Sequence, residues 1–430
     1  LYGQFDMVSS ATSIAGTAYD KVWTDSSGEF EIFPLGDPRC SNRSSQDGVV
    51  FDTGYGTCIA ADGNGVERYN LWGLTQKRGK IERQNLLVFI NSELSNGVET
   101  FTEIGYYTSD SERRNHPSYA FTSSKHRVGP DNYWLNQMTI PDGTAIFAGK
   151  ELYIDNYRYA EVPRMTFVDK ETYRFLQGFR GTTGNWDWET ALVYSKATSD
   201  DLTKNRISNT LLKEALYDDT PAAYNPFSAG VASNIERVLV DVTRFGTSSL
   251  TSFDFKMVNP EMFTLPAGPV AVLLGFEVRD EVITDDRDDR LDGTIDYCDY
   301  ENDCYPLVAD VVNSSPTGDV SGERQTTSLF VELNAPITDS ISTQLAVRHE
   351  SSDDFASATV GKFAIGWEVN PSLSLRASAS TAFRAPNIIQ LNEGGVVRSG
   401  TRDDWVVQRV QDILNEAGGY EGILTLMTQI

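Results

Sequence analysis

Hydrophobic and polar residues alternate with a period of two in the region 323–387 of this chain. In one typical segment Phe363 and Trp367 lie on one side of the backbone, and Lys362 and Glu368 lie on the other. A period of two is the pattern of β-strands whose two faces meet different surroundings. The region therefore predicts strands of about ten residues each.

Similar strands recur between Gln84 and Arg384, and we expect ten of them in total. Short stretches of turn-forming residues lie between some neighbours, at 95–97, 183–185, 266–268, 336–339 and 370–372. Other connections are long, at about 109–168, 197–249 and 283–324. Short connections at one end and long ones at the other are typical of outer-membrane proteins. The sequence therefore predicts an all-β fold, an antiparallel transmembrane β-barrel with short periplasmic turns and long extracellular loops.

The alternation also predicts which face meets lipid. The even positions of 186–194 and 270–278 are mostly apolar, and the charged residues Asp187, Glu189, Glu277 and Arg279 alternate with them. In a transmembrane barrel the apolar face meets hydrocarbon and the polar face lines the lumen. We therefore expect Trp188 and Leu274 to face lipid and Glu277 to face the lumen.

Several stretches resemble motifs of the TonB-dependent outer-membrane receptors. Residues 263–281 are similar to the family's hairpin with a Leu-Pro-Ala-Gly-Pro turn and a Gly-x-Glu-x-Arg return strand. Residues 373–391 are similar to its strand with Leu-Arg-Ala-Ser followed by Phe-Arg-Ala-Pro. The motif residues are Leu265, Pro266, Gly268, Glu277, Arg279, Arg376, Phe383, Arg384, Ala385 and Pro386. Their shared order along the chain carries the resemblance.

The resemblance implies a function and its partners. Such receptors import a scarce nutrient, such as a siderophore, cobalamin or an oligosaccharide, which is bound by extracellular loops in the bacterial outer membrane. The inner-membrane protein TonB supplies energy through a plug domain. A passive porin-like channel and a secreted all-β binding protein are the alternatives. The implied partners are outer-membrane lipid, TonB and a small nutrient, with no nucleic acid.

The resemblance also predicts how much of a barrel is present. About 10–12 strands are expected from a barrel of about 22, with the plug and the C-terminal strands missing and two free sheet edges. All of 1–430 is interpreted as one partial barrel domain. Within it, 1–82 holds the first strands and a Cys-containing loop, 83–391 holds the strand hairpins, and 392–430 holds an extracellular loop with a short helix. A further helix is predicted at 207–216 from its apolar spacing.

Composition narrows the function further. The formal net charge of -25 argues against a nucleic-acid partner. The mean hydropathy is negative, and no apolar run is long enough for a transmembrane helix. The chain has three histidines and none of the common nucleophile, phosphate-loop or metalloprotease motifs, so we expect neither an enzyme nor a cofactor.

The four cysteines form two local pairs in presumed loops, Cys40 with Cys58 and Cys298 with Cys304. Local pairs without a nearby histidine favour disulfides over zinc. The acid-rich segment 285–303 lacks the spacing of a calcium loop, so calcium is the less favoured interpretation and no metal site is predicted.

Basic and aromatic residues gather in the presumed loop that starts near residue 109. Such a mixture is found at ligand-binding mouths, but equally in solvated loops that rest on their neighbours. The candidate ligand contacts are Arg113, Arg114, His116, Tyr119, Tyr133 and Trp134.

Overall fold

The computed structural model describes residues 4–7, 30–35, 40, 51–60, 75–120, 126–139, 143, 145, 147, 149–228, 230, 232–300 and 304–394. These residues lie in the first of two compact units, Leu1–Val396. In these ranges no helix combines the length and the apolar character that a membrane crossing requires.

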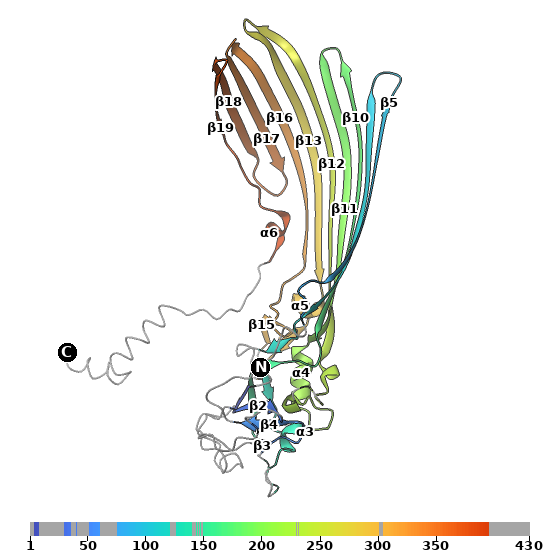
Figure 1. Cartoon of the computed structure of the whole chain (residues 1–430), viewed down its shortest axis with the longest axis vertical. Coiled ribbons are helices and arrows are strands. Elements are labelled where there is room, and N and C mark those ends of the chain that lie inside the picture. Colours follow the sequence, from blue (N-terminus) through green and yellow to red (C-terminus); the bar gives the residue numbers. More distant parts are fainter. Residues whose placement is uncertain are drawn as a thin grey trace, which may run out of the picture. The chain divides into compact units, whose positions relative to one another are not determined.

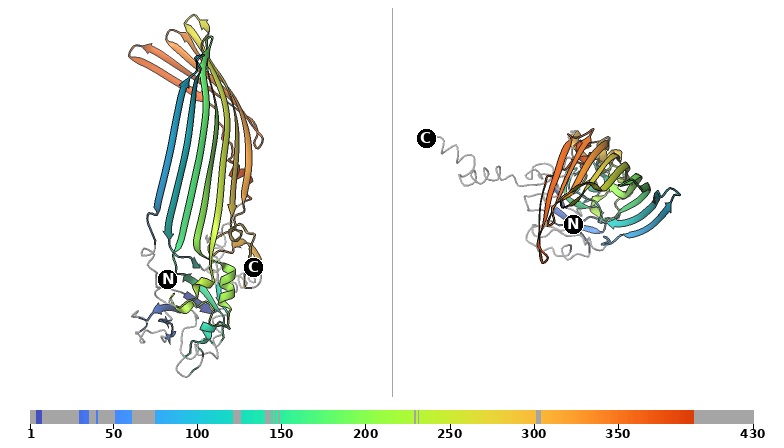
Figure 2. Two further views of the ribbon diagram at one scale, coloured as in Figure 1. Left: turned by 90° about the vertical axis from the view of Figure 1, so that its right-hand side faces the viewer. Right: turned by 90° about the horizontal axis from the view of Figure 1, so that it is seen from above.

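Most of the described chain forms one antiparallel sheet of ten strands, the number expected from the alternation. Figure 1 shows the long strands side by side, and the view from above in Figure 2 shows that the sheet is curved. In spatial order the strands are β5 (Lys80–Glu93), β6 (Glu99–Asn115), β10 (Arg164–Thr183), β11 (Trp186–Ile207), β12 (Leu239–Leu265), β13 (Gly268–Arg287), β16 (Val320–Thr338), β17 (Ile341–Ser352), β18 (Ala358–Asn370) and β19 (Leu373–Ser380).

The connections are segregated by length, as the sequence predicts. Five tight turns join β5 to β6, β10 to β11, β12 to β13, β16 to β17 and β18 to β19, so all lie at one end of the sheet. Three of them contain glycines with positive φ, Gly97 at 79°, Gly184 at 60° and Gly268 at 137°, where other residues are strained. At the opposite end the connections are long, except for the short one between β17, which ends at Ser352, and β18, which begins at Ala358.

The expected strand length of about ten residues fits β17, β18 and β19, with 12, 13 and 8 residues, but not β16, with 19. The strands before this region are longer still, since β12 has 27 residues and β11 has 22. The predicted loops at 109–168, 197–249 and 283–324 accordingly begin later and end earlier. On β11 the alternation stops after Tyr194, but backbone pairing continues to Ile207. The apolar positions of a strand can stop while its backbone hydrogen bonds to the neighbouring strands continue. The sequence pattern indicates only the part that has apolar positions.

The apolar residues of the convex face form a band that crosses the strands obliquely. Its edge toward the long connections is placed at the residue beyond which the next position on the same face is not apolar: Tyr173, Tyr194, Phe253, Val278, Leu329, Val347 and Phe363. Single apolar residues recur on that face beyond this edge, at Phe167, Leu202, Phe245 and Val282. In the strand register this edge shifts by two residues at every step except from β12 to β13. In total the edge shifts by ten residues, each about 3.3 Å along the strand, over six inter-strand spacings of about 4.8 Å. This ratio corresponds to a strand tilt of about 50° relative to the normal of the band. Strands of transmembrane barrels are tilted by about 35–45°.

Register pairing keeps charge on the other face, called the polar face below. Glu277 is opposite Asp254 and Ser328, whereas Phe276 is opposite Phe255 and Leu329. The predicted alternation is therefore continuous from strand to strand.

Glycines make room for large rings on the polar face. Gly178 is paired with Phe101, and a Cβ atom on Gly178 would lie 2.1 Å from the Cζ atom of that ring. Gly275 is paired with Phe330 in the same way, with 2.3 Å to its ring. A glycine opposite an aromatic residue lets the ring lie flat on the sheet.

Seven further strands build a smaller sheet, in the order β3 to β4 to β2 to β1 to β9 to β7, with β8 also paired to β9, and β14 (Asp296–Cys298) and β15 (Cys304–Ala309) form a separate two-stranded sheet. The seven strands are β1 (Gln4–Met7), β2 (Phe30–Pro34), β3 (Phe51–Asp52), β4 (Thr57–Ala60), β7 (Tyr119–Ala120), β8 (His126–Val128) and β9 (Leu152–Arg158). The described strands of 1–60 thus belong to this sheet, in contrast to the expected first barrel strands in 1–82. Strands of two to five residues are too short to cross a bilayer.

The smaller sheet packs with two helices into what we call the loop module. The helices are α3 (Tyr133–Asn136) and α4 (Asn209–Leu216), followed by the 3₁₀ turns η2 (Pro226–Ser228) and η3 (Ile235–Arg237). Its core includes Ile32, Ile154 and Leu212, none of which is exposed to solvent. The helix predicted near 207–216 is α4, whereas the one predicted after residue 402 lies outside the described residues.

The large sheet is open, as expected for a partial barrel. Its edges are β5 and β19, and β1 pairs with β2 and β9 rather than with either edge. The ladder between the first and last strands that would close a small barrel is not formed by the described residues.

Candidate functional site

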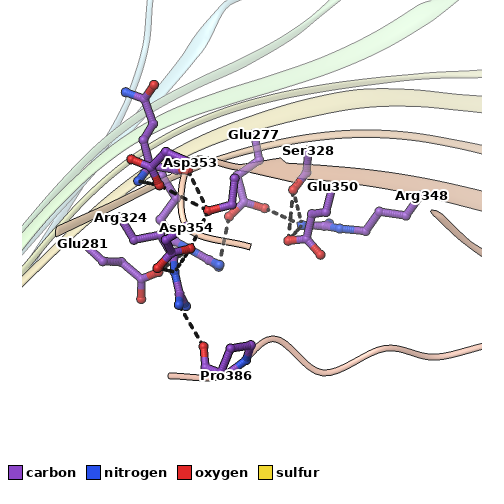
Figure 3. Close-up of polar contacts among 12 residues, drawn as sticks. Glu277, Glu281, Arg324, Ser328, Arg348, Glu350, Asp353, Asp354 and Pro386 are labelled. Atoms are coloured by element: carbon purple, nitrogen blue, oxygen red, sulfur yellow. Dashed lines mark hydrogen bonds and ion pairs between the residues drawn. The ribbon is translucent and has the colours of Figure 1, made fainter. Parts of the chain in front are cut away.

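The polar face carries an ion-pair network on β13, β16 and β17 (Figure 3). One nitrogen of Arg348 donates to Ser328 Oγ at 2.9 Å and to a carboxylate oxygen of Glu277 at 3.2 Å. Arg279 lies 3.6 Å from Glu277 and 3.3 Å from Glu281. Because these side chains come from alternate positions of neighbouring strands, period-two spacing alone brings them together. The face is therefore charged and rich in hydrogen bonds.

Arg324 on β16 anchors the segment that follows β19. Its guanidinium contacts Asp354 at 2.7 Å and donates to the carbonyl oxygen of Pro386 at 2.8 Å (Figure 3). It also lies over the ring of Phe355, which contacts Phe383 at 6.0 Å. The segment beyond β19 is thus fixed across the polar face, instead of continuing along the sheet edge.

The helix α6 (Ile388–Asn392) completes this cover. Its N-cap is Asn387, whose side chain accepts from the backbone of Gln390 while Gln390 bonds back, forming a capping box. A Cβ atom on Gly322 of β16 would lie 2.5 Å from Ile388 and Asn392, so the helix rests directly on that glycine.

Near the tight turns the polar face has a hollow of about 560 Å³ between β6, β10, β11 and β12. Its two cations are paired, because Arg180 contacts Glu99 at 2.6 Å and Lys256 contacts Glu189 at 2.7 Å. Asp187 also lines the hollow and accepts from the hydroxyl of Thr182 at 2.7 Å, so the hollow offers no unpaired cation to a ligand.

The loop module contains a buried group of tyrosines around one carboxylate. The hydroxyl of Tyr224 donates to Glu161 at 2.9 Å and lies 3.0 Å from the hydroxyl of Tyr157. Burial raises the pKa of Glu161, and the hydrogen bonds from Ser233 and Tyr224 oppose that shift. Burial also raises the pKa of Tyr224 well above its usual range. Tyr224 therefore acts as a neutral donor to this carboxylate.

Two disulfides and several polar contacts hold the long connections. The structure pairs Cys40 with Cys58 and Cys298 with Cys304, the second pair joining β14 (Asp296–Cys298) to β15 (Cys304–Ala309). Lys213 on α4 donates to the carbonyl oxygen of Asp299 at 2.6 Å. The disulfide-closed hairpin is thus attached to the helix of another connection.

The acid-rich segment is engaged by arginines and by its own backbone. Asp285 contacts Arg244 at 2.6 Å and Arg287 at 2.9 Å. Asp288 caps α5 (Asp289–Asp292) by accepting from Arg290 N. Across the described ranges no group of three or more His, Cys, Asp or Glu side chains could hold a metal ion.

The six candidate ligand contacts are separated in the structure. Arg113 and Arg114 are exposed neighbours at the end of β6, so their side chains point to opposite faces. His116 and Tyr119 form a ring contact at 5.8 Å, and Arg158 covers the ring of Tyr119.

Tyr133 and Trp134 lie instead on α3, inside the loop module. Trp134 donates from its indole nitrogen to the carbonyl oxygen of Ala223 at 2.9 Å and contacts the ring of Tyr55 at 5.3 Å. Such contacts position loop segments, and a ligand-binding role for any of the six residues stays a prediction.

Comparisons with known proteins place this architecture in a family. Residues 100–412 match the family described as TonB dependent receptor-like, beta-barrel. The chain belongs to the TonB-dependent receptor β-barrel family. This family consists of receptors and transporters of the bacterial outer membrane, and not of enzymes. No curated protein matches the chain.

Three solved structures match part of the chain. The siderophore receptor PirA from Acinetobacter baumannii is 13% identical, with a TM-score of 0.41, over 74% of this chain and 36% of its own. The ferric enterobactin receptor PfeA from Pseudomonas aeruginosa, in complex with enterobactin, is 14% identical, with a TM-score of 0.39, over 77% and 38%. The RagAB peptide importer is 11% identical, with a TM-score of 0.39, over 67% and 30%. The chain thus spans about a third of the length of these structures.

The TonB-dependent receptor motifs map to two places on the barrel. Leu265, Pro266 and Gly268 form the turn between β12 and β13, where Gly268 has φ 137° and a Cβ atom would lie 3.3 Å from Pro336. Glu277 and Arg279 belong to the polar network.

The second motif covers β19 and the segment after it. Arg376 lies on the polar face, and Phe383 and Pro386 belong to the segment that Arg324 holds. Arg384 is exposed and Ala385 is half-buried. Arg324 itself was not predicted, although its place on the polar side of an alternating strand was a usable signal.

Proposed function

We propose that this chain is part of an outer-membrane receptor that imports a scarce nutrient with energy delivered through TonB. The observation that carries the proposal is the tilted apolar band backed by a charged face. The band would meet lipid, and the polar face would line the uptake path. Family membership adds energy coupling, which no feature of the barrel wall alone implies.

The loop module is the proposed capture site. It joins residues from four distant parts of the sequence, such as Ile32, Ile154, Ile207 and Val312, into one core. A preorganised group of loops can present a fixed surface to a solute, and loops set specificity on a constant scaffold. Siderophores, cobalamin, oligosaccharides and peptides are the nutrient classes to be tested.

The test is uptake by cells that express the complete gene containing this chain. Labelled members of each nutrient class are supplied in turn, with and without a protonophore that dissipates the proton-motive force. The proposal expects accumulation of one class, abolished by the protonophore and by deletion of the host TonB.

The alternatives give different results in the same experiment. Uptake that is indifferent to the protonophore would identify a passive channel. Protein recovered from the medium or from the soluble fraction, and not from outer membranes on a density gradient, would identify a secreted binding protein.

A further inference from the structure

The connection between β13 and β16 carries a small hairpin, β14 and β15, that is closed by a disulfide. Cys298 is opposite Cys304 in the register of the two strands, and the two cysteines are six positions apart in the sequence. We call residues 298–300 the tip of this hairpin and residues 309–310 its base. A cross-link over so few residues limits the conformations that the tip can adopt when it is not held by other contacts.

The base of the hairpin is fixed at the N-terminal end of α4. The side chain of Asp310 is not exposed to solvent. It accepts hydrogen bonds from Ser208 Oγ and from the backbone N–H of Thr210, both at 2.8 Å. Arg290 forms an ion pair with the same carboxylate. None of these four residues belongs to the tip, so they should hold the base whether or not the disulfide is intact.

The tip is held farther along the same helix. Lys213 donates to the carbonyl oxygen of Cys298 at 3.3 Å and to that of Asp299 at 2.6 Å. The ring of Tyr300 stacks on the ring of Tyr217 at 5.5 Å, with 28° between the ring planes. Tyr217 is the C-cap of α4, four residues beyond Lys213. The tip therefore contacts the second half of the helix, whereas the base contacts its beginning.

Tyr300 also joins the hairpin to the smaller sheet. Arg127 on β8 lies over its ring at 5.4 Å, and Lys213 lies over it at 5.6 Å. Cations are attracted to the face of an aromatic ring. Arg127 is itself positioned by Glu151 at 3.5 Å and by the ring of Tyr153 at 5.1 Å. One tyrosine of the tip thus contacts two other long connections, the one that contains β8 and the one that contains α4.

The two disulfides of the chain differ in exposure. Cys304 is exposed and Cys298 is half-buried, whereas Cys58 of the other disulfide is only 1% exposed within the smaller sheet. Thiol–disulfide exchange begins when a thiolate reaches one of the two sulfur atoms. A thiol in solution should therefore reduce the Cys298–Cys304 bond before the Cys40–Cys58 bond.

We propose that the Cys298–Cys304 disulfide is a redox-sensitive switch that controls whether the tip stays docked on α4. A dithiol supplies two electrons and two protons, so the S–S bond breaks, two protein thiols form and the dithiol becomes a cyclic disulfide. The undocked tip then has more conformations available, and Tyr300 leaves Tyr217 and Arg127 more often. Asp310 keeps the base in place. Reduction thus loosens the contacts among the three long connections while the large sheet is unchanged, and this inference does not rest on the proposed function.

The experiment is amide hydrogen exchange, followed by mass spectrometry, on the complete protein in detergent. The oxidised protein is compared with protein treated with dithiothreitol, and peptide mapping with a thiol label shows which disulfide has been reduced. Peptides that cover 213–217 and 296–300 should exchange about 10- to 100-fold faster after reduction. Peptides from β12 and β13 should exchange as before, and reoxidation should restore the slow exchange.

Variants separate the switch from a general loss of structure. Replacing both cysteines of the pair, Cys298→Ser with Cys304→Ser, should give the fast exchange without reductant, and dithiothreitol should then add nothing. Tyr300→Ala keeps the disulfide but removes the ring contacts, so exchange in 213–217 should be fast before and after reduction. The matched control is Cys40→Ser with Cys58→Ser, in which dithiothreitol should still accelerate exchange at the tip.

Three results would overturn the proposal, and each can be obtained with the unmodified protein. The first is exchange in 213–217 that is the same in the oxidised and the reduced protein. The second is reduction of the Cys40–Cys58 bond before the Cys298–Cys304 bond. The third is faster exchange in β12 and β13 together with the tip, because it would show that the disulfide stabilises the whole fold rather than the docking of the tip.

Discussion

Replacing Leu274 with arginine tests the orientation of the whole sheet. Leu274 is the middle of the five even positions 270–278, and its side chain is 40% exposed on the convex face. These positions span eight residues, about 26 Å along the strand, or about 17 Å of height at the tilt derived above. Leu274 therefore lies near the middle of the apolar band.

The expected cost follows from that height. An arginine that faces lipid near the bilayer midplane destabilises a barrel by about 2–4 kcal/mol, and one near an interface by about 0–1 kcal/mol. Leu274→Arg should cost the larger amount. The matched control is Leu273→Arg, the same substitution one residue away, which faces the polar side opposite Glu332 and should cost little.

The assay is reversible unfolding of the complete protein in lipid vesicles, followed by tryptophan fluorescence during a denaturant titration. Val272 is a poor substitute for Leu274, since it is only 9% exposed next to the irregular pairing after Asn259, and a change there would also disturb packing. Equal free-energy costs for the variants at 273 and 274, or a larger cost at 273, would refute the assignment of the faces.

Three further predictions concern packing, cross-links and pH. Gly178→Ala should destabilise by about 1–3 kcal/mol through overlap with the Phe101 ring, and adding Phe101→Ala should recover part of that loss; additive costs in a double-mutant cycle would contradict the contact. Peptide mapping without reductant should recover the two local disulfides described above, and crossed pairs or free thiols would exclude them. Burial lowers the pKa of His126 in the loop module to about 4. Between pH of about 6.5 and 4 the unfolded chain binds a proton at this histidine and the folded chain does not. The module should therefore lose up to about 3 kcal/mol of stability as pH falls through this range. His126→Phe should remove this part of the pH dependence, and an unchanged unfolding profile across that range would show that His126 is not buried in its neutral form.

The ten-strand sheet was predictable because its information is local. The alternation of Phe363 and Trp367 with Lys362 can be read from the sequence without knowing how the strands pair, and turn residues mark each reversal of the chain. Strand ends beyond Tyr194 were not predictable by this means, since both faces become polar there while the backbone ladder continues.

The loop module was hidden from the sequence for a different reason. Its strands are short, and Phe5 pairs with Ile154, about 150 positions away, so neither period nor neighbouring turns indicate the contact. Helix α4 was predicted because its apolar residues repeat at helical spacing. The grouping of Arg113 with Arg114 as ligand contacts followed from composition, which ignores that adjacent strand residues face opposite ways.

Beyond the apolar band the strands continue as a stretch with mostly polar residues, called the polar extension here. This stretch changes the free-energy cost of leaving an edge of the barrel wall unpaired. On β5 the residues Leu86, Val88 and Ile90 mark the stretch whose free N–H and C=O groups would face hydrocarbon, where each costs several kcal/mol unless a neighbouring strand pairs with it. From Lys80 to Gln84 the same edge belongs to the polar extension, where water can hydrogen bond to it. Within the bilayer this edge of the wall must therefore be paired with a neighbouring strand, whereas above the bilayer the polar extension costs little when it is unpaired.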